Sequence, residues 1–269
     1  MRVVWSVVVG AVLCLVAGPA GAEELRLLAA GSLREVMTEL TASFTARFGV
    51  PVRADFGPSG LLRERIEGGE RADLFASADM GHPAALHAAG RSGPVVMFTR
   101  NSFCALARAS VGLTRESFLD RLLDPGVRLG TSTPRADPSG DYTWMLFRRA
   151  DGIRPGSFAQ LDRKAQQVVG GPQNSALVDG RSPVAVALER GLVDVYLGYC
   201  TSVETVHRQV AGLVVVPVPD ALQVGPEYGL TILKGAQPGA VDLALYILSP
   251  DGQALLAKHG FAPVGLPAR

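Results

Sequence analysis

Three short segments of the sequence place a serine where a predicted strand gives way to a predicted helix. They are Ala30-Gly31-Ser32-Leu33, Gly57-Pro58-Ser59-Gly60 and Asp137-Pro138-Ser139-Gly140. A serine at a helix start accepts a hydrogen bond from a free backbone N–H, which stabilises the helix by about 1 kcal/mol. Helix starts also bind anions, because their N–H groups and positive dipole end point outward and glycine permits close approach. The pattern therefore fits either plain capping or an anion site.

The other residues that could do chemistry form no catalytic or metal-binding pattern. The histidines are His82, His87, His207 and His259. None of them has the H-x-x-x-H spacing of a metal site. Ser59 lacks the G-x-S-x-G spacing of a nucleophile elbow, because Leu61 stands where the second glycine belongs. Asp73 and Asp79 could act as paired carboxylates, but Asp79 at a helix start is more simply a cap.

Composition limits the classes of protein that fit. The chain has 269 residues, of which 48% are hydrophobic and 19% charged, with a formal net charge of +1. The apolar fraction excludes a disordered chain and allows one large or two medium domains. The balanced charge argues against nucleic acid as a partner, because binding through phosphates needs a strongly basic surface.

Residues 1–22 are predicted to be a cleaved signal peptide. Arg2 precedes an apolar run over residues 3–17, and small residues lead to a cleavage site after Ala22. The alternative is a membrane anchor, but this run is shorter than the roughly 20 apolar residues that a spanning helix needs. Cys14 follows Leu13, where a lipoprotein would have a small residue. We therefore expect a mature, formally neutral chain in the periplasm.

Two cysteines remain after cleavage, Cys104 and Cys200. An oxidising compartment permits a disulfide between them. Their spacing in the sequence does not decide whether they meet, so both the bridge and two free thiols stay open.

Strand and helix patterns alternate along the mature chain. Strands are predicted at residues 25–30, 50–56, 73–77, 95–99, 103–107, 127–130, 193–199, 213–218 and 228–234, and helices at 33–48, 61–66, 80–89, 115–123, 141–150, 183–190, 203–210, 240–247 and 252–259. Such alternation indicates an α/β fold with parallel sheets flanked by helices. No Pro-rich linker divides the chain, which is consistent with two lobes joined by crossing strands and a ligand cleft between them.

Several of these stretches resemble the periplasmic molybdate-binding proteins of ABC transporters. The specific match is Arg71-Ala72-Asp73-Leu74-Phe75-Ala76-Ser77-Ala78-Asp79, which is close to that family's A-D-L-F-x-S-A-D block. The opening Leu28-Ala29-Ala30-Gly31-Ser32-Leu33 resembles its first strand and serine turn. Phe56-Gly57-Pro58-Ser59-Gly60 resembles its second serine loop, and Leu197-Gly198-Tyr199-Cys200-Thr201 its late strand ending in a ligand-binding tyrosine.

The resemblance implies a two-lobed type II periplasmic binding protein, with mainly parallel sheets and a ligand cleft between the lobes. Lobe I would comprise residues 23–98 and 226–269, and lobe II residues 99–225. The implied ligand is a tetrahedral oxyanion, molybdate or tungstate, delivered to the permease and ATPase subunits of an ABC importer. The implied protein is a monomer without enzymatic activity, cofactor or metal beyond the molybdenum of its ligand.

By position, the resemblance assigns the ligand-binding roles to Ser32 and Ser59 in lobe I and to Ser139, Arg181 and Tyr199 in lobe II. Ser139 stands where the family uses a backbone N–H, and Arg181 near a second backbone donor. The sequence departs from the family in the turn that contains Ser139, which brings Asp141 beside the expected site. Two rival hypotheses stay open: a binding protein for sulfate or for a small carboxylate clamped by Arg181, and a secreted enzyme on the same fold.

Overall fold

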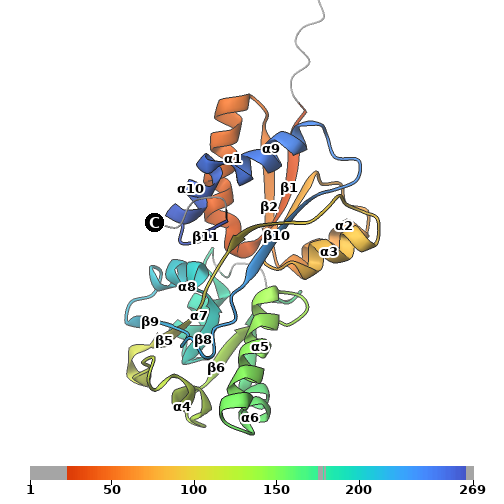
Figure 1. Cartoon of the computed structure of the whole chain (residues 1–269). Coiled ribbons are helices and arrows are strands. Elements are labelled where there is room, and N and C mark those ends of the chain that lie inside the picture. Colours follow the sequence, from red (N-terminus) through yellow and green to blue (C-terminus); the bar gives the residue numbers. More distant parts are fainter. Residues whose placement is uncertain (1–22, 175–177, 179, 265–269) are drawn as a thin grey trace, which may run out of the picture.

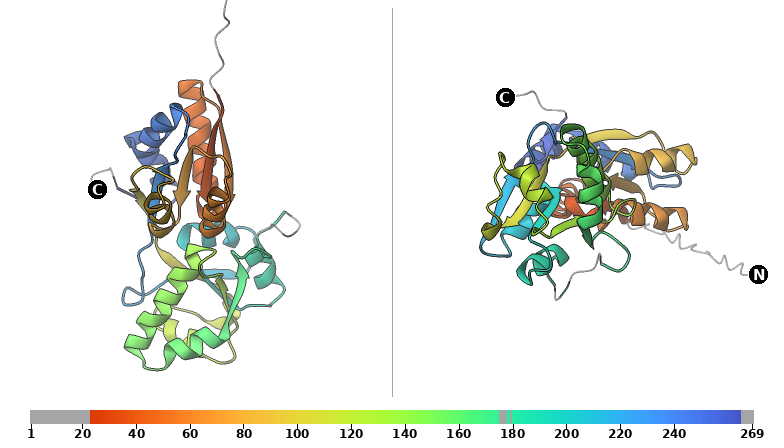
Figure 2. Two further views of the ribbon diagram at one scale, coloured as in Figure 1. Left: turned by 90° about the vertical axis from the view of Figure 1, so that its right-hand side faces the viewer. Right: turned by 90° about the horizontal axis from the view of Figure 1, so that it is seen from below.

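A computed structural model describes residues 23–174, 178 and 180–264, which form two lobes (Figure 1). The predicted signal peptide, residues 1–22, lies outside the described residues. The lobes stack end to end in both side views, and the chain crosses between them at the segments that link β4 to β5 and β9 to β10 (Figures 1 and 2). Within the described parts of the chain, no helix has the length and apolar character needed to cross a membrane.

The first lobe contains a six-stranded sheet in the order β11-β4-β10-β3-β1-β2. Its strands are β1 (Leu25–Ala30), β2 (Val52–Gly57), β3 (Leu74–Ser77), β4 (Val96–Arg100), β10 (Glu227–Ile232) and β11 (Ala262–Pro263). Its helices are α1 (Arg34–Phe48), α2 (Ser59–Glu67), α3 (Gly81–Ala88), α9 (Gly239–Leu248) and α10 (Pro250–Lys258). β1 pairs in parallel with β2 and β3, whereas β10 is antiparallel to both β3 and β4.

Strand β1 shows why helices cover both faces of this sheet. Leu25 and Leu27 lie in the same apolar cluster as Leu40 of α1, and Leu28 lies in another cluster with Leu62 of α2. Side chains alternate between the two faces of a strand, so an almost wholly apolar strand is stable only between two covering layers.

The second lobe contains a five-stranded sheet in the order β7-β6-β8-β5-β9. Its strands are β5 (Phe103–Arg108), β6 (Leu129–Ser132), β7 (Ala165–Val169), β8 (Val195–Tyr199) and β9 (Leu213–Pro217). Its helices are α4 (Phe118–Leu123), α5 (Pro138–Ile153), α6 (Ser157–Lys164), α7 (Pro183–Glu189) and α8 (Cys200–His207). β6 is parallel to β7 and β8, and β5 is antiparallel to β8 and β9.

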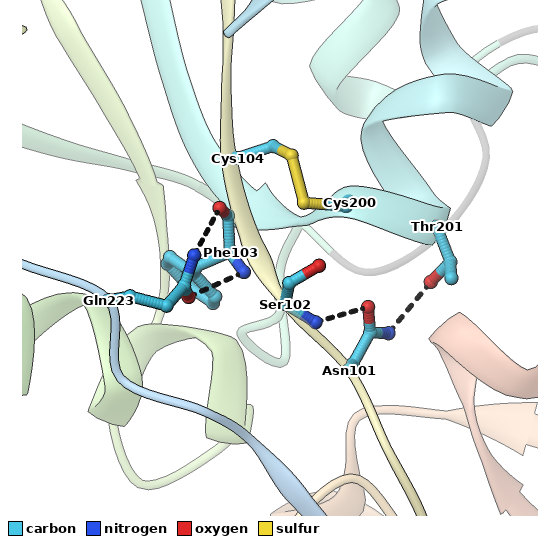
Figure 3. Close-up of a disulfide and its surroundings, with 7 residues drawn as sticks. All are labelled: Asn101, Ser102, Phe103, Cys104, Cys200, Thr201 and Gln223. Atoms are coloured by element: carbon cyan, nitrogen blue, oxygen red, sulfur yellow. Dashed lines mark hydrogen bonds between the residues drawn. A yellow bond between two sulfur atoms is a disulfide. The ribbon is translucent and has the colours of Figure 1, made fainter. Parts of the chain in front are cut away.

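Cys104 on β5 and Cys200 at the start of α8 form a disulfide, with their Cα atoms 4.9 Å apart (Figure 3). The two cysteines therefore meet, which their spacing in the sequence left undecided. The bridge ties the strand that enters the second lobe to the helix that follows β8.

The predicted fold class, α/β with two lobes and flanking helices, is confirmed, and both sheets are of mixed direction. The strands of the first sheet fall within residues 25–100 and 227–263, and those of the second within 103–217. The exact lobe boundaries stay a prediction. Helix α6 and strand β7 were not predicted, although Phe158 and Leu161 of α6 stand at helical spacing and pack in the core.

Candidate functional site

A cavity of about 180 Å³ lies between the two lobes. Its walls include the ends of strands β1, β2 and β8 and the starts of helices α2 and α5. The cavity is smaller than the roughly 300–1,000 Å³ of pockets that hold drug-sized ligands, so it suits a small ligand. The residues around it are Ala30, Gly31, Ser32, Arg34, Phe56, Gly57, Pro58, Ser59, Ala78, Asp137, Ser139, Val169, Gly170, Ser182, Val184, Tyr196, Tyr199, Ser202 and Val206.

A larger hollow of about 550 Å³ lies elsewhere on the first lobe, and we do not regard it as the site. Its most enclosed carboxylate, Asp73, already accepts hydrogen bonds from the backbone N–H groups of Arg26 at 2.7 Å and Gln237 at 2.9 Å. Among the described residues, all that line it belong to the first lobe, so closure of the lobes would not change it.

Ser32 and Ser59, the two first-lobe residues that the sequence singled out, both line the cavity. Ser32 lies in the short 3-10 turn that follows β1, and its Oγ is 3.0 Å from the hydroxyl of Tyr228. Ser59 is the first residue of α2 and is fully buried. Its Oγ accepts a hydrogen bond from the backbone N–H of Ala78 at 3.1 Å. Because an acceptor position of Ser59 is filled in this way, its own hydroxyl proton is free to be donated into the cavity.

The second lobe contributes the start of α5. Asp137 is the N-cap residue of this helix, and its carboxylate accepts hydrogen bonds from Ser139 N at 3.0 Å and Ser132 Oγ at 2.7 Å. The backbone N–H of Ser139, the donor expected for a ligand, is therefore already bonded within the protein. The hydroxyl of Ser139 is buried beside the phenol of Tyr196 and makes no well-formed hydrogen bond within the described residues, so it can turn toward a ligand.

Asp137 itself lines the cavity and was not predicted as a site residue. Burial raises the pKa of its carboxyl, and the hydrogen bonds from Ser132 and Ser139 partly oppose that shift. The sequence predicted a carboxylate beside the site but named Asp141, which does not line the cavity and accepts from the backbone N–H of Arg135 at 3.1 Å. The Asp-Pro pair before Ser139 is a typical helix start and could have identified Asp137.

Tyr199 ends β8 at the cavity wall, as predicted. Its hydroxyl donates to the carbonyl oxygen of Ala78 at 3.4 Å, a long contact that a better acceptor could replace. Burial raises the pKa of Tyr199, so its phenol keeps its proton and acts as a donor. Tyr196 also lines the cavity and was not predicted.

Arg181 does not join the other four predicted residues. Its guanidinium pairs with Glu189 at 2.8 Å on a half-exposed surface, and its backbone N–H donates to Val178 O at 2.9 Å. The next residue, Ser182, lines the cavity in its place. The structure thus places Arg181 outside the residues that line the cavity, with its side chain paired to Glu189 of α7 and its N–H bonded to Val178.

Arg34 is the cationic side chain around the cavity, and it was not predicted from the sequence. It begins α1 two residues after Ser32, and its guanidinium lies 4.7 Å from the ring centroid of Phe56. Within the described residues it has no ion-pair partner, so its charge is available at the mouth of the cavity. Among the residues that the structure describes, no group of three or more His, Cys, Asp or Glu side chains could hold a metal ion.

Direct contacts between the lobes surround the cavity. Gly60 N donates to Ala136 O at 2.9 Å, and Arg208 of the second lobe forms an ion pair with Glu35 of α1 at 3.1 Å. These contacts hold together the two lobes whose residues line the cavity.

Comparison with known proteins agrees with this two-lobed arrangement. Residues 25–262 match the family described as bacterial extracellular solute-binding proteins. The chain belongs to this family. Membership makes it a solute-binding protein of a family that acts outside the cytoplasm. It confirms the sequence-based prediction of a solute-binding protein.

Two relatives and one solved structure illustrate the similarity. An uncharacterized protein of Pasteurella multocida is 36% identical over 241 residues, covering 89% of this chain and 98% of the relative. The molybdate-binding protein ModA of Mycobacterium tuberculosis is 28% identical over 251 residues, covering 91% and 87%. The structure of the sulfate-binding protein SubI from M. tuberculosis superposes with a TM-score of 0.74 at 20% identity, covering 90% and 87%. At that identity the superposition supports the fold alone.

Proposed function

We propose that this protein captures a small tetrahedral oxyanion in the periplasm, molybdate or tungstate, and delivers it to the permease and ATPase subunits of an ABC importer. It acts as a binding protein without catalysis. The observation that carries the proposal is the convergence of neutral donors, the hydroxyls of Ser32, Ser59, Ser139 and Tyr199, on one small cavity between the lobes.

These donors suit a fully ionised anion. A buried dianion loses a large hydration free energy, and several short charge-assisted hydrogen bonds from fixed donors can offset that loss. Ser59 begins α2, whose positive dipole end adds favourable potential. Arg34 supplies a positive charge at the mouth. The similarity to a molybdate-binding protein supports the same ligand class.

Asp137 favours a second candidate ligand, an oxyanion that carries a proton, such as hydrogen phosphate. A carboxylate at the cavity wall repels a dianion, but it can accept a hydrogen bond from a protonated oxygen. Among the residues around the cavity, none favours sulfate, a small carboxylate or an enzymatic reaction over these two ligands.

Isothermal titration of residues 23–269 with molybdate, tungstate, sulfate and phosphate tests the proposal. We expect heat and a thermal shift with molybdate and tungstate and none with phosphate. Binding of phosphate alone would instead favour the protonated ligand, and no response to any of the four would overturn the oxyanion proposal.

Ser59→Ala tests the site itself. Loss of a hydrogen bond to a charged ligand costs about 1.5–3 kcal/mol, so the affinity should fall about 10- to 150-fold. Ser157→Ala is the matched control, because Ser157 is also buried, lies in α6 away from the cavity and has no partner for its hydroxyl among the described residues. Equal affinity of the two variants would place the ligand elsewhere.

A further inference from the structure

Asn101 lies where the chain first crosses between the lobes, between β4 and β5. Its side chain is buried, and its Oδ1 accepts a hydrogen bond from the backbone N–H of Ser102 at 2.9 Å (Figure 3). A backbone N–H can only donate, so the oxygen of the amide must face Ser102. The amide nitrogen of Asn101 therefore faces the opposite way.

That nitrogen has two protons and uses both. One is donated to Thr201 Oγ1 of the second lobe at 2.9 Å (Figure 3), and the other to the hydroxyl of Tyr228 of the first lobe at 3.2 Å. The amide is held by elements of both lobes, which prevents it from rotating. Tyr228 consequently receives a hydrogen bond from Asn101 and must send its own proton elsewhere.

Tyr228 is fully buried, and burial raises its pKa, so its phenol keeps its proton. Among the described residues, Ser32 Oγ at 3.0 Å is the one other partner of this hydroxyl. Tyr228 therefore donates to Ser32. With an acceptor position of Ser32 filled, the hydroxyl proton of Ser32 points away from Tyr228, toward the cavity that Ser32 lines.

We propose that Asn101 is a positioning residue that fixes, through Tyr228, the direction of the Ser32 hydroxyl and so makes Ser32 a hydrogen-bond donor to the ligand. The inference deepens the proposed function and rests on it. The order of donation is Asn101 to Tyr228, Tyr228 to Ser32, and Ser32 to an oxygen of the ligand. The site is thereby committed to ligands that accept hydrogen bonds before any ligand enters.

Asn101→Asp reverses this order with almost no change in side-chain shape. A carboxylate can only accept, so Tyr228 would donate to position 101 and Ser32 would have to donate to Tyr228. The lone pairs of Ser32 would then face the ligand. We expect the affinity for molybdate at pH 8 to fall at least about tenfold.

The Tyr228→Phe variant distinguishes an effect carried by the hydrogen bonds from Asn101 through Tyr228 to Ser32, here called the relay, from a direct effect of the added negative charge. In that background the link from position 101 to Ser32 is absent, so Asn101→Asp should lower the affinity only slightly further. An equal loss from Asn101→Asp with and without Tyr228 would overturn the proposal, because it would show that the negative charge acts directly.

A second readout needs no ligand. In the free wild-type protein, the buried hydroxyl proton of Tyr228 should show a nuclear Overhauser contact to the β-protons of Ser32, and Asn101→Asp should abolish it. Persistence of that contact in the variant would overturn the relay. Failure of the wild type to bind any oxyanion, with this contact behaving as expected, would overturn only the proposed function.

Discussion

The backbone N–H of Gly60 donates to the carbonyl oxygen of Ala136 at 2.9 Å, and this hydrogen bond joins the two lobes at the edge of the cavity. Gly60 follows Ser59 in the first turn of α2, whereas Ala136 precedes Asp137 in the second lobe. The contact therefore brings the start of α2, with Ser59, against the N-cap of α5, Asp137. Closure and ligand contact depend on the same two segments.

Gly60→Ala should prevent this closure. A Cβ at position 60 would lie 2.2 Å from Arg135 O and 2.7 Å from Ala136 O, closer than backbone atoms allow. We expect the affinity for molybdate to fall at least about tenfold, because a ligand gains affinity only through its preference for the closed form. Small-angle scattering should show no compaction when ligand is added.

Gly152→Ala is the control for Gly60→Ala. Gly152 lies in α5, and a Cβ there would meet nothing within 4 Å. This variant should bind and close like the wild type. Normal ligand-induced compaction in Gly60→Ala would contradict a role for the Gly60–Ala136 contact.

Asp137→Asn should change both stability and selectivity. Because burial raises the pKa of Asp137, the folded state binds its proton more tightly than the unfolded state does. The free energy of unfolding therefore falls as the pH rises above the ordinary pKa of Asp, until the folded-state pKa is passed, and the substitution should flatten this fall. Asparagine is also a good N-cap, so α5 should be preserved.

In the same variant the affinity for molybdate should rise by about tenfold, because a repelling charge is removed, and hydrogen phosphate should gain nothing. Asp120→Asn, which neutralises an exposed partner of Arg154 in the same lobe, controls for net charge. Chemical denaturation at several pH values and calorimetric titration are the measurements. A weaker affinity for molybdate would contradict the assigned electrostatic role of Asp137.

Arg34→Ala should weaken oxyanion binding about three- to tenfold, with the larger loss at low salt, because an exposed charge at the cavity mouth is screened by ions. Arg181→Ala is the matched comparison, since Arg181 is half-exposed and paired with Glu189. It should leave the affinity within about twofold. Abolished binding in Arg181→Ala would instead favour a carboxylate clamp.

Loss of the Cys104–Cys200 disulfide should lower stability without removing the fold class. The two residues are 96 positions apart, and crosslinks of that span reduce the entropy of the unfolded chain by an amount equivalent to about 4–5 kcal/mol. For a chain of this size the Tm should fall by about 10–15 °C in a Cys104→Ala/Cys200→Ala variant. A reducing agent should produce the same change in the wild type and none in the variant.

The sequence was sufficient for the fold class, and it marked three serines that the structure places around one cavity. Apolar periodicity located β1 and α1, and the residue preferences of helix starts marked Ser32, Ser59 and Ser139. It did not reveal α6 and β7, which are only eight and five residues long and so shorter than the stretch in which a period is readily recognised. Nor did it show that Arg181 pairs with Glu189, because that ion pair depends on the path of the intervening chain.

The sequence by itself determined which residues stand at strand ends and helix starts, because those preferences are local. Only the tertiary structure decided which groups are free. The Ala78 N–H fills an acceptor position of Ser59, Asp137 takes the N–H of Ser139, and Asn101 reaches Ser32 through Tyr228. Whether a polar group can serve a ligand depends on its remaining hydrogen-bonding capacity, and that capacity is set by partners that folding brings from distant parts of the chain.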